Sequence, residues 1–181
     1  MTQRRFALLL AVLIFTLAAG GCTRYVKTSQ GRKAIEKTQR QLQKADATMT
    51  ADAREKALIL LTLRRDGADL GKAPYVALTQ QIAALATIRK ELKTISTAIK
   101  QLAREYKQTV GNSKKVRSTE KNKWNTVNRI RNQLMAKSRA AQGVLQRYQS
   151  ASKNIAKTAK RHKIGKMQTG PLRKQLRTFL N

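Results

Sequence analysis

A seven-residue repeat of large apolar side chains between residues 74 and 110 constrains the fold more than any other feature. The members of the first row are Leu78, Leu85, Leu92, Ile99 and Tyr106, and those of the second row are Ile88, Ile95 and Leu102. On a helix this spacing places both rows on one stripe, as the a and d positions of a coiled coil do. The repeat therefore predicts a helix that packs against other helices along its whole length.

Two further segments carry weaker versions of the same repeat. Residues 32–65 contain Ile35, Leu42 and Met49 at seven-residue spacing. Residues 114–163 place Val127, Leu134, Ala141, Tyr148 and Ile155 at that spacing, and the neighbouring row combines Trp124 and Leu145 with the polar Arg131, Ser138 and Ser152. Because the third segment would be longer than the first two, we expect its end beyond Tyr148 to project.

Glycine and proline separate these segments. We interpret as joints Gly31, Gly67, Gly71, Gly111, Gly165 and Gly170, together with Pro74 and Pro171. The connection between the first two helices is short, so these helices should run antiparallel. No alternating strand pattern of useful length is present.

A fourth helical segment is predicted at residues 171–180. Its apolar residues are Leu172, Leu176, Phe179 and Leu180, which suit a short amphipathic helix. The predicted fold is therefore all-α: an elongated antiparallel three-helix coiled-coil-like bundle with a short C-terminal amphipathic helix.

The N-terminus has the composition of an export signal. Arg4 and Arg5 precede a run of 14 residues without charge, Phe6 to Ala19, and small residues follow up to Cys22. Two other interpretations stay open. The run is short for a transmembrane helix, which needs about 20 apolar residues, and an ordinary cleaved signal would leave Cys22 as a free thiol.

The segment Ala19-Gly20-Gly21-Cys22 resembles the lipobox of bacterial lipoproteins, and the resemblance covers residues 1–22 only. It implies that the signal peptide, residues 1–21, is removed and that Cys22 carries a covalent lipid such as palmitate. The remaining chain would then comprise a lipidated tether (22–31), a helical bundle (32–165) and a basic, amphipathic tail (166–181). The resemblance also implies a lipid-anchored protein of the bacterial cell envelope. Because Thr23 rather than aspartate follows the cysteine, the periplasmic face of the outer membrane is favoured in a Gram-negative source.

The chain is strongly basic, and the charge is unevenly distributed. Its formal charge of +30 becomes +28 when Arg4 and Arg5 leave with the signal. From Tyr106 onward, 20 basic residues accompany a single acid, Glu120. Such a charge attracts polyanions. The candidate binding residues are Lys114, Lys115, Arg117, Lys121, Lys123 and Arg129 in a first basic cluster, and Lys157, Lys160, Arg161, Lys163 and Lys166 in a second basic cluster.

The chain lacks the residues that most catalytic and metal sites require. It has one histidine, His162, which lies among cations, and its carboxylates are scattered among lysines and arginines. We therefore predict no catalytic residues, no metal site, no enzymatic activity and no cofactor apart from the lipid on Cys22. Nucleic acid is not an expected partner in the cell, because the chain has an export signal and few aromatic residues that could stack on bases.

These features predict a non-catalytic, lipid-anchored scaffold whose distal basic surface binds anionic envelope polymers or membrane surfaces. The alternative is a structural subunit of an envelope complex that associates, with itself or with another protein, through coiled-coil contacts. A third interpretation is that the basic surplus is only a solvated compositional bias.

Overall fold

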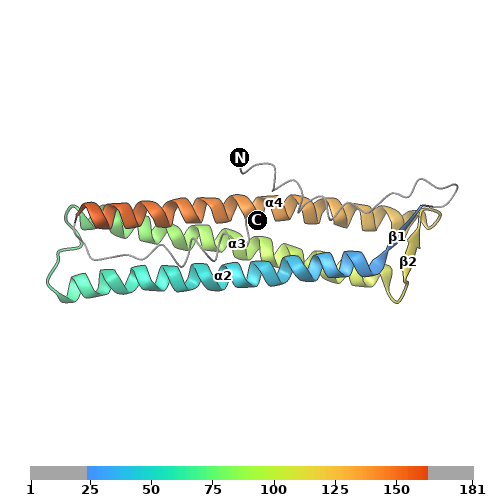
Figure 1. The fold of residues 1–181 in the computed structure, drawn as a ribbon, viewed down its shortest axis with the longest axis horizontal. Helices are drawn as coiled ribbons and strands as arrows, with labels where there is room; N and C mark the ends of the chain where they lie inside the picture. Colours follow the sequence, from blue (N-terminus) through green and yellow to red (C-terminus); the bar gives the residue numbers. More distant parts are fainter. Residues whose placement is uncertain (1–23, 163–181) are drawn as a thin grey trace. The chain divides into compact units, whose positions relative to one another are not determined.

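The computed structural model describes residues 24–162, which form three long helices and one small sheet (Figure 1). In chain order the elements are β1 (Tyr25–Lys27), α2 (Thr28–Arg65), α3 (Tyr75–Val110), β2 (Lys115–Arg117) and α4 (Lys121–Arg161). The prediction of a mainly helical chain is confirmed. The signal peptide, Cys22 and the C-terminal segment 166–181 lie outside the described residues.

The two strands were not predicted. β1 and β2 pair antiparallel, with Val26 opposite Val116. Each strand has three residues, which is too short for an alternating pattern to stand out from its surroundings. Residues 25–31, predicted as part of a tether, lie in β1 and in the first turn of α2, and α4 begins at Lys121 rather than at residue 114.

Two compact units divide the described chain, and each helix contributes one stretch to each of them. Unit 1 comprises residues 24–41 and 95–140, and unit 2 comprises residues 42–94 and 141–162.

The core of unit 1 closes against the sheet. Both central valines of the sheet are buried, and so is Tyr106. The Tyr106 hydroxyl donates a hydrogen bond to the backbone oxygen of Thr28 (3.1 Å), and the Thr28 hydroxyl donates one to the backbone oxygen of Ser113 (2.6 Å). The start of α2, the end of α3 and the connection to β2 are therefore joined by buried polar contacts. The other buried apolar residues of unit 1 include Ile35, Ile99, Leu102, Val110, Val127, Ile130 and Leu134.

The core of unit 2 contains the predicted heptad residues of all three helices. Its fully or almost fully buried side chains include Leu42, Met49, Leu78, Leu85, Leu92, Leu145, Tyr148 and Ile155. The expectation that α4 projects beyond Tyr148 is wrong, because Ser152, Ile155 and Ala159 are completely buried. The physical reason is that residues 111–120 form a turn and β2, so α4 is shorter than predicted and its end packs in unit 2.

Glycines end two of the helices as expected, whereas Gly31 has a different role. Gly67 and Gly111 adopt positive φ angles of 86° and 50° at the C-terminal ends of α2 and α3. Gly31 was predicted as a joint, but it lies within α2, where a Cβ atom would overlap the hydroxyl group and ring of Tyr106. A glycine is therefore needed there because the two helices approach closely.

Candidate functional site

The outward face of the two-stranded sheet carries three cations and no acidic side chain. Tyr25, Lys27, Lys115 and Arg117 are exposed, whereas the central valine of each strand is buried. This alternation follows from the pleat, which points successive side chains to opposite faces. We call these four exposed residues the ribbon face.

The pairing of the strands places like charges opposite each other on the ribbon face. Lys27 is the direct partner of Lys115, and Tyr25 is the direct partner of Arg117. The Lys115 ammonium lies 4.4 Å from the centre of the Tyr25 ring, which is a cation–π contact. Two opposed lysines repel each other across a sheet, so this arrangement favours an anion in front of the pair.

Glu120 lies beside the ribbon face and binds both Arg117 and Lys123. Glu120 accepts hydrogen bonds from the backbone N–H of Arg117 (2.9 Å) and from Lys123 Nζ (3.2 Å). The backbone N–H of Arg117, followed by Lys123, lowers the pKa of the Glu120 carboxyl. Within residues 24–162, no ion pair engages the side chains of Lys27, Lys115 or Arg117.

The first basic cluster lies entirely in unit 1, and its six side chains are exposed. Two of them have acidic partners: Lys123 pairs with Glu120, and Arg129 pairs with Glu105. In the second basic cluster Lys157, Lys160 and Arg161 are exposed on α4 in unit 2, and Lys163 and Lys166 lie outside the described residues.

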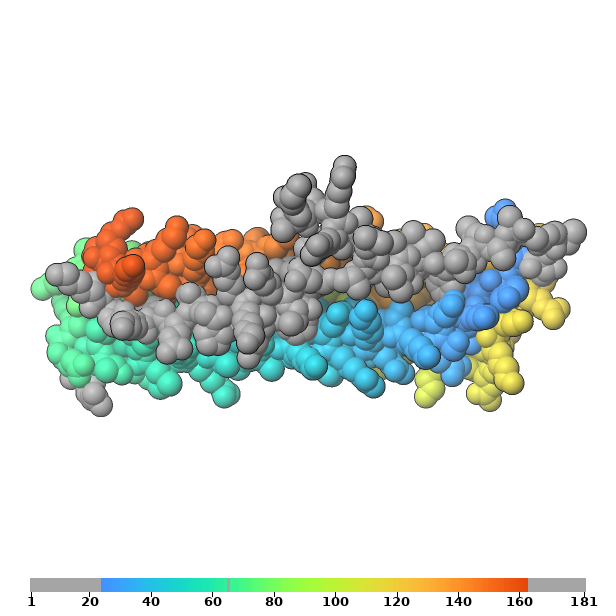
Figure 2. All heavy atoms as spheres, in the orientation of Figure 1, coloured from blue at the N-terminus to red at the C-terminus, as the bar shows by residue number. Residues whose placement is uncertain are grey.

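The structure brings part of the first basic cluster beside the start of the described chain. Residues 115–117 pair with residues 25–27, although about 90 positions separate them. In the space-filling view, the atoms of β1 and the beginning of α2 (blue) lie next to those of the α3–β2 connection and β2 (yellow) (Figure 2). Arg24 and Lys27 belong to the predicted lipidated tether, but the sequence does not show that they and Tyr25 lie beside residues 115–118. The sequence indicates Arg24 and Lys27 as cations just after Cys22, but it does not indicate that residues 115–117 form the strand that pairs with residues 25–27.

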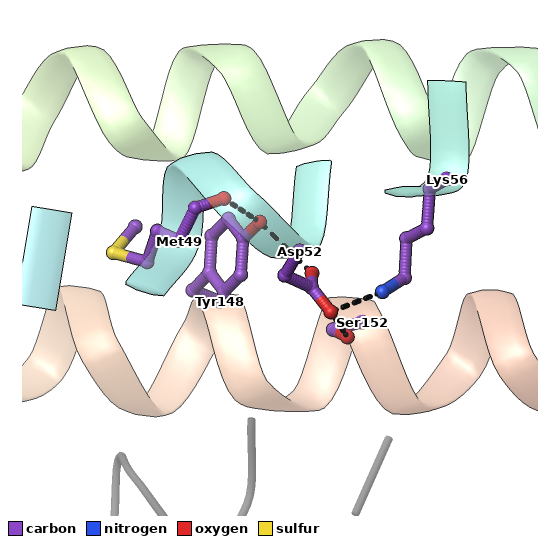
Figure 3. A network of polar contacts seen from close by, with 5 residues as sticks. All are labelled: Met49, Asp52, Lys56, Tyr148 and Ser152. Atoms are coloured by element: carbon purple, nitrogen blue, oxygen red, sulfur yellow. Dashed lines mark hydrogen bonds and ion pairs between the residues drawn. The ribbon is translucent and has the colours of Figure 1, made fainter. Parts of the chain in front are cut away.

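Unit 2 contains a buried cluster of four polar side chains from α2 and α4: Asp52, Lys56, Tyr148 and Ser152 (Figure 3). The Tyr148 hydroxyl lies 2.7 Å from the backbone oxygen of Met49 and 3.0 Å from Asp52 Oδ2, and these two acceptors share its single proton. Asp52 Oδ1 accepts a hydrogen bond from Ser152 (3.3 Å) and forms an ion pair with Lys56. The carboxylate is therefore surrounded by donors, which a buried charge requires.

The surroundings of Tyr148 favour its neutral form. Burial is the largest cause that raises the pKa of its phenol, and the charge and hydrogen bond of Asp52 raise it further. The phenol therefore remains a donor to Asp52 over the whole physiological range.

These four residue types occur in many active sites, but their placement here is structural. Lys56 and Ser152 have an exposed fraction of 0%, so no substrate reaches them without unfolding of the surrounding helices. In the sequence, Asp52 is one of the scattered carboxylates, and Ser152 is a polar residue in an otherwise partly apolar row. The sequence does contain one indication of this cluster. Asp52 and Lys56 are four residues apart, so they lie on the same face of α2, and Ser152 supplies a polar position on α4 that could face them.

Within the part of the chain that the structure describes, no helix has an apolar stretch long enough to cross a membrane. Residues 24–162 likewise contain no group of three or more His, Cys, Asp or Glu side chains that could hold a metal ion. Comparison of the chain with protein-family models, with curated proteins and with solved structures finds no match.

Proposed function

We propose that this chain is a lipid-anchored, non-catalytic protein of the bacterial cell envelope, and that its basic surface binds anionic envelope polymers or membrane surfaces. One observation carries this proposal. The β1–β2 pairing gathers exposed cations from two distant parts of the sequence, and within residues 24–162 no ion pair engages the side chains of Lys27, Lys115 or Arg117. Cations without acidic partners keep their full attraction for a polyanion.

The helical scaffold is proposed to be an antiparallel, coiled-coil-like packing of three helices within each unit. Contacts between every pair of helices in unit 2 support this packing. Arg89 of α3 donates to Thr50 of α2 (2.5 Å), and Arg147 of α4 donates to Glu91 of α3 (2.5 Å). Tyr148 of α4 reaches α2 through Met49. Burial of the seven-residue rows and the short connection between α2 and α3 further support it.

Lipidation of Cys22 is testable on the full-length chain by incorporation of radiolabelled palmitate in bacterial cells, followed by membrane fractionation. We expect the wild-type chain to be labelled and to sediment with membranes. The Cys22→Ala variant should be unlabelled and should keep its first 21 residues. Thr23→Ala is the matched control, because it changes the next position and leaves the thiol; it should be labelled like the wild type. A wild-type chain without label would refute the lipid anchor.

The alternative function, assembly with protein partners, is favoured by a different observation. The seven-residue row of α3 is buried within this chain and is not free for another molecule. Leu58 and Leu61, however, are 62% and 61% exposed on α2. These two leucines are one helical turn apart and form an apolar surface that a partner could cover.

Substitution of this apolar surface separates the two functions. The full-length double variant Leu58→Gln and Leu61→Gln should keep its helix content by circular dichroism and should still bind anionic vesicles if the primary proposal is correct. Loss of a chemically crosslinked complex from cells, with unchanged binding to vesicles, would favour assembly as the main role.

A further inference from the structure

We propose that the ribbon face is a binding surface for anionic lipid headgroups, and that it holds unit 1 against the same membrane that carries the lipid anchor. This assignment rests on the proposed lipidation of Cys22, and it names the partner of the basic surface. The sequence leaves open whether the basic surface extends away from the anchor or lies on the same membrane, and this proposal selects the second arrangement.

Chain connectivity supports this partner. Arg24 is two residues after Cys22, and consecutive Cα atoms are 3.8 Å apart, so the two Cα atoms are separated by at most about 7.6 Å. Arg24 continues the sheet, since its backbone oxygen accepts a hydrogen bond from the N–H of Ser118 (2.8 Å). A lipid on Cys22 would therefore hold the ribbon face within a short distance of the headgroups.

The sheet gives this surface a fixed geometry that a flexible tether would lack. Residues 25–27 are tied to residues 115–117 by the ladder, and Thr28 is tied to Ser113 and Lys114 by backbone and side-chain hydrogen bonds. Buried Val26 and Val116 face the core of unit 1. The ribbon face consequently points away from that core, with its cations in a defined arrangement.

The charge pattern fits phosphate groups arranged on a surface. Lys27 and Lys115 oppose each other without a carboxylate between them, and Arg117 adds a fork-shaped donor next to them. Near an anionic membrane each such cation contributes about fivefold in affinity. Tyr25, half exposed, has the ring and hydroxyl that favour the boundary between headgroups and acyl chains.

The test is a lysine footprint of the intact lipidated protein, purified from membranes and reconstituted into vesicles. One set contains phosphatidylcholine alone and the other contains phosphatidylcholine with phosphatidylglycerol. The amine-acetylation rate of each lysine is measured by mass spectrometry. We expect acetylation of Lys27 and Lys115 to be slower by about fivefold or more in the anionic vesicles. Lys100 and Lys137 are internal references, because they are exposed residues of unit 1 that lie about 15 Å and 24 Å along α3 and α4 from the helix ends next to the ribbon.

A matched pair of variants tests whether the ribbon face itself is responsible. The first variant carries Lys27→Gln, Lys115→Gln and Arg117→Gln. The control variant removes three exposed charges elsewhere in unit 1 through Lys100→Gln, Lys137→Gln and Arg139→Gln. Protection of Lys114 by anionic lipid should be lost in the first variant and retained in the control. Circular dichroism establishes that both are folded.

Each remaining outcome has a distinct meaning. If the wild-type protein is lipidated and stays in the vesicles, but Lys27 and Lys115 react equally in both lipid mixtures, the headgroup assignment is wrong and the lipid anchor stands. Uniform protection of all lysines would show a diffuse charge effect and would also overturn the assignment. If Lys27 and Lys115 are protected only when soluble polyphosphate is added to the phosphatidylcholine vesicles, and not by anionic lipid, the ribbon face binds a polymer instead of headgroups. A chain that carries no lipid would refute the proposed function itself.

Discussion

At the residue scale, the cluster around Asp52 shows how a buried charge is accommodated in this chain. The Asp52 carboxylate has three side-chain partners, Lys56, Tyr148 and Ser152, and all four residues are buried. A charge in this position is stable only while its partners are present. The cluster also connects α2 to α4 at one position, so it favours one register of these two helices.

Removal of the carboxylate should be much more costly than removal of one hydrogen bond. Asp52→Asn leaves the Lys56 ammonium buried without its counter-ion, and we expect unfolding to become easier by about 3 to 5 kcal/mol. Tyr148→Phe removes a hydrogen bond to a charged group and should cost about 1.5 to 3 kcal/mol. Urea unfolding followed by circular dichroism measures both values.

Glu91→Gln is the control for these variants, because it breaks the exposed ion pair with Arg147. Exposed pairs contribute about 0 to 1 kcal/mol. The pair of changes Asp52→Leu with Lys56→Met should recover most of the stability lost in Asp52→Asn. A cost for Asp52→Asn as small as that for Glu91→Gln would contradict the buried ion pair.

The two buried tyrosines predict a loss of stability in alkali. Burial is the largest cause that raises the pKa values of Tyr106 and Tyr148 above the ordinary value of 10.0. Above pH 10 the unfolded chain releases these protons while the folded chain retains them. Stability should therefore be unaffected by these groups below pH 10 and should fall as the pH rises further, by up to about 1.4 kcal/mol per pH unit for each group.

The pH dependence is checked by urea unfolding at several pH values for the wild type and for Tyr148→Phe. The wild type should lose stability above pH 10 more steeply than the variant, because only the wild type retains this phenol proton on folding. Equal slopes for both proteins would show that Tyr148 does not titrate differently in the folded and unfolded chains.

At the element scale, two helical glycines have opposite requirements. Gly31 in α2 faces the Tyr106 side chain of α3, and no space exists for a Cβ atom. Gly143 in α4 has no atom within 4 Å of the position that a Cβ would take. Substitution by alanine therefore tests helix propensity at Gly143 and the close contact between α2 and α3 at Gly31.

Gly31→Ala should destabilise unit 1, because the added methyl group must displace Tyr106 or α2, at a cost of about 1 to 3 kcal/mol. Gly143→Ala should stabilise the chain by about 0.5 to 1 kcal/mol, since alanine is the better helix former and nothing obstructs it. Thermal unfolding followed by circular dichroism compares the two variants. Stabilisation by both substitutions would contradict the close approach of Tyr106 to α2.

At the scale of the whole molecule, charge dominates the chemistry of this chain. A formal charge of +30 over 181 residues attracts phosphates over distances that depend on screening. Exposed cations of both basic clusters contribute to this attraction. The ribbon face differs in that the sheet holds its cations in fixed positions.

Binding of the purified chain to phosphatidylglycerol vesicles should be strong in dilute salt and should weaken steeply as salt rises. The reason is that the screening length falls from about 10 Å at 0.1 M to about 3 Å at 1 M. Vesicle sedimentation over a salt series measures this dependence, with phosphatidylcholine vesicles as the control. A lipid-anchored preparation would remain attached at any salt, and so would a chain that keeps the apolar run of residues 6–19, so this measurement uses the Cys22→Ala chain without residues 1–21. Binding that does not change with salt would exclude an electrostatic origin.

The sequence was a good guide to the helices and a poor guide to their contacts. The predicted row from Leu78 to Tyr106 is buried in α3, and the helix ends at Gly67 and Gly111 match the turns. Helical periodicity and helix-ending glycines are local properties, so they are readable from a few neighbouring residues. The partner of β1 was not predictable in this way, because β2 is about 90 positions away and neither strand exceeds three residues.

The sequence by itself determined that this chain is helical, strongly basic and poor in catalytic groups, because periodicity, charge and residue inventory are properties of the chain before it folds. Only the tertiary structure decided that Lys115 and Arg117 lie beside Lys27 and that Lys56 is buried against Asp52. It also decided that Tyr106 occupies the position that a Cβ atom on Gly31 would need. In each case the sequence pattern does not show that the two residues are in contact. The packing of the helices and the pairing of two short strands bring them together, and on that basis the candidate anion-binding surface belongs next to the start of the described chain.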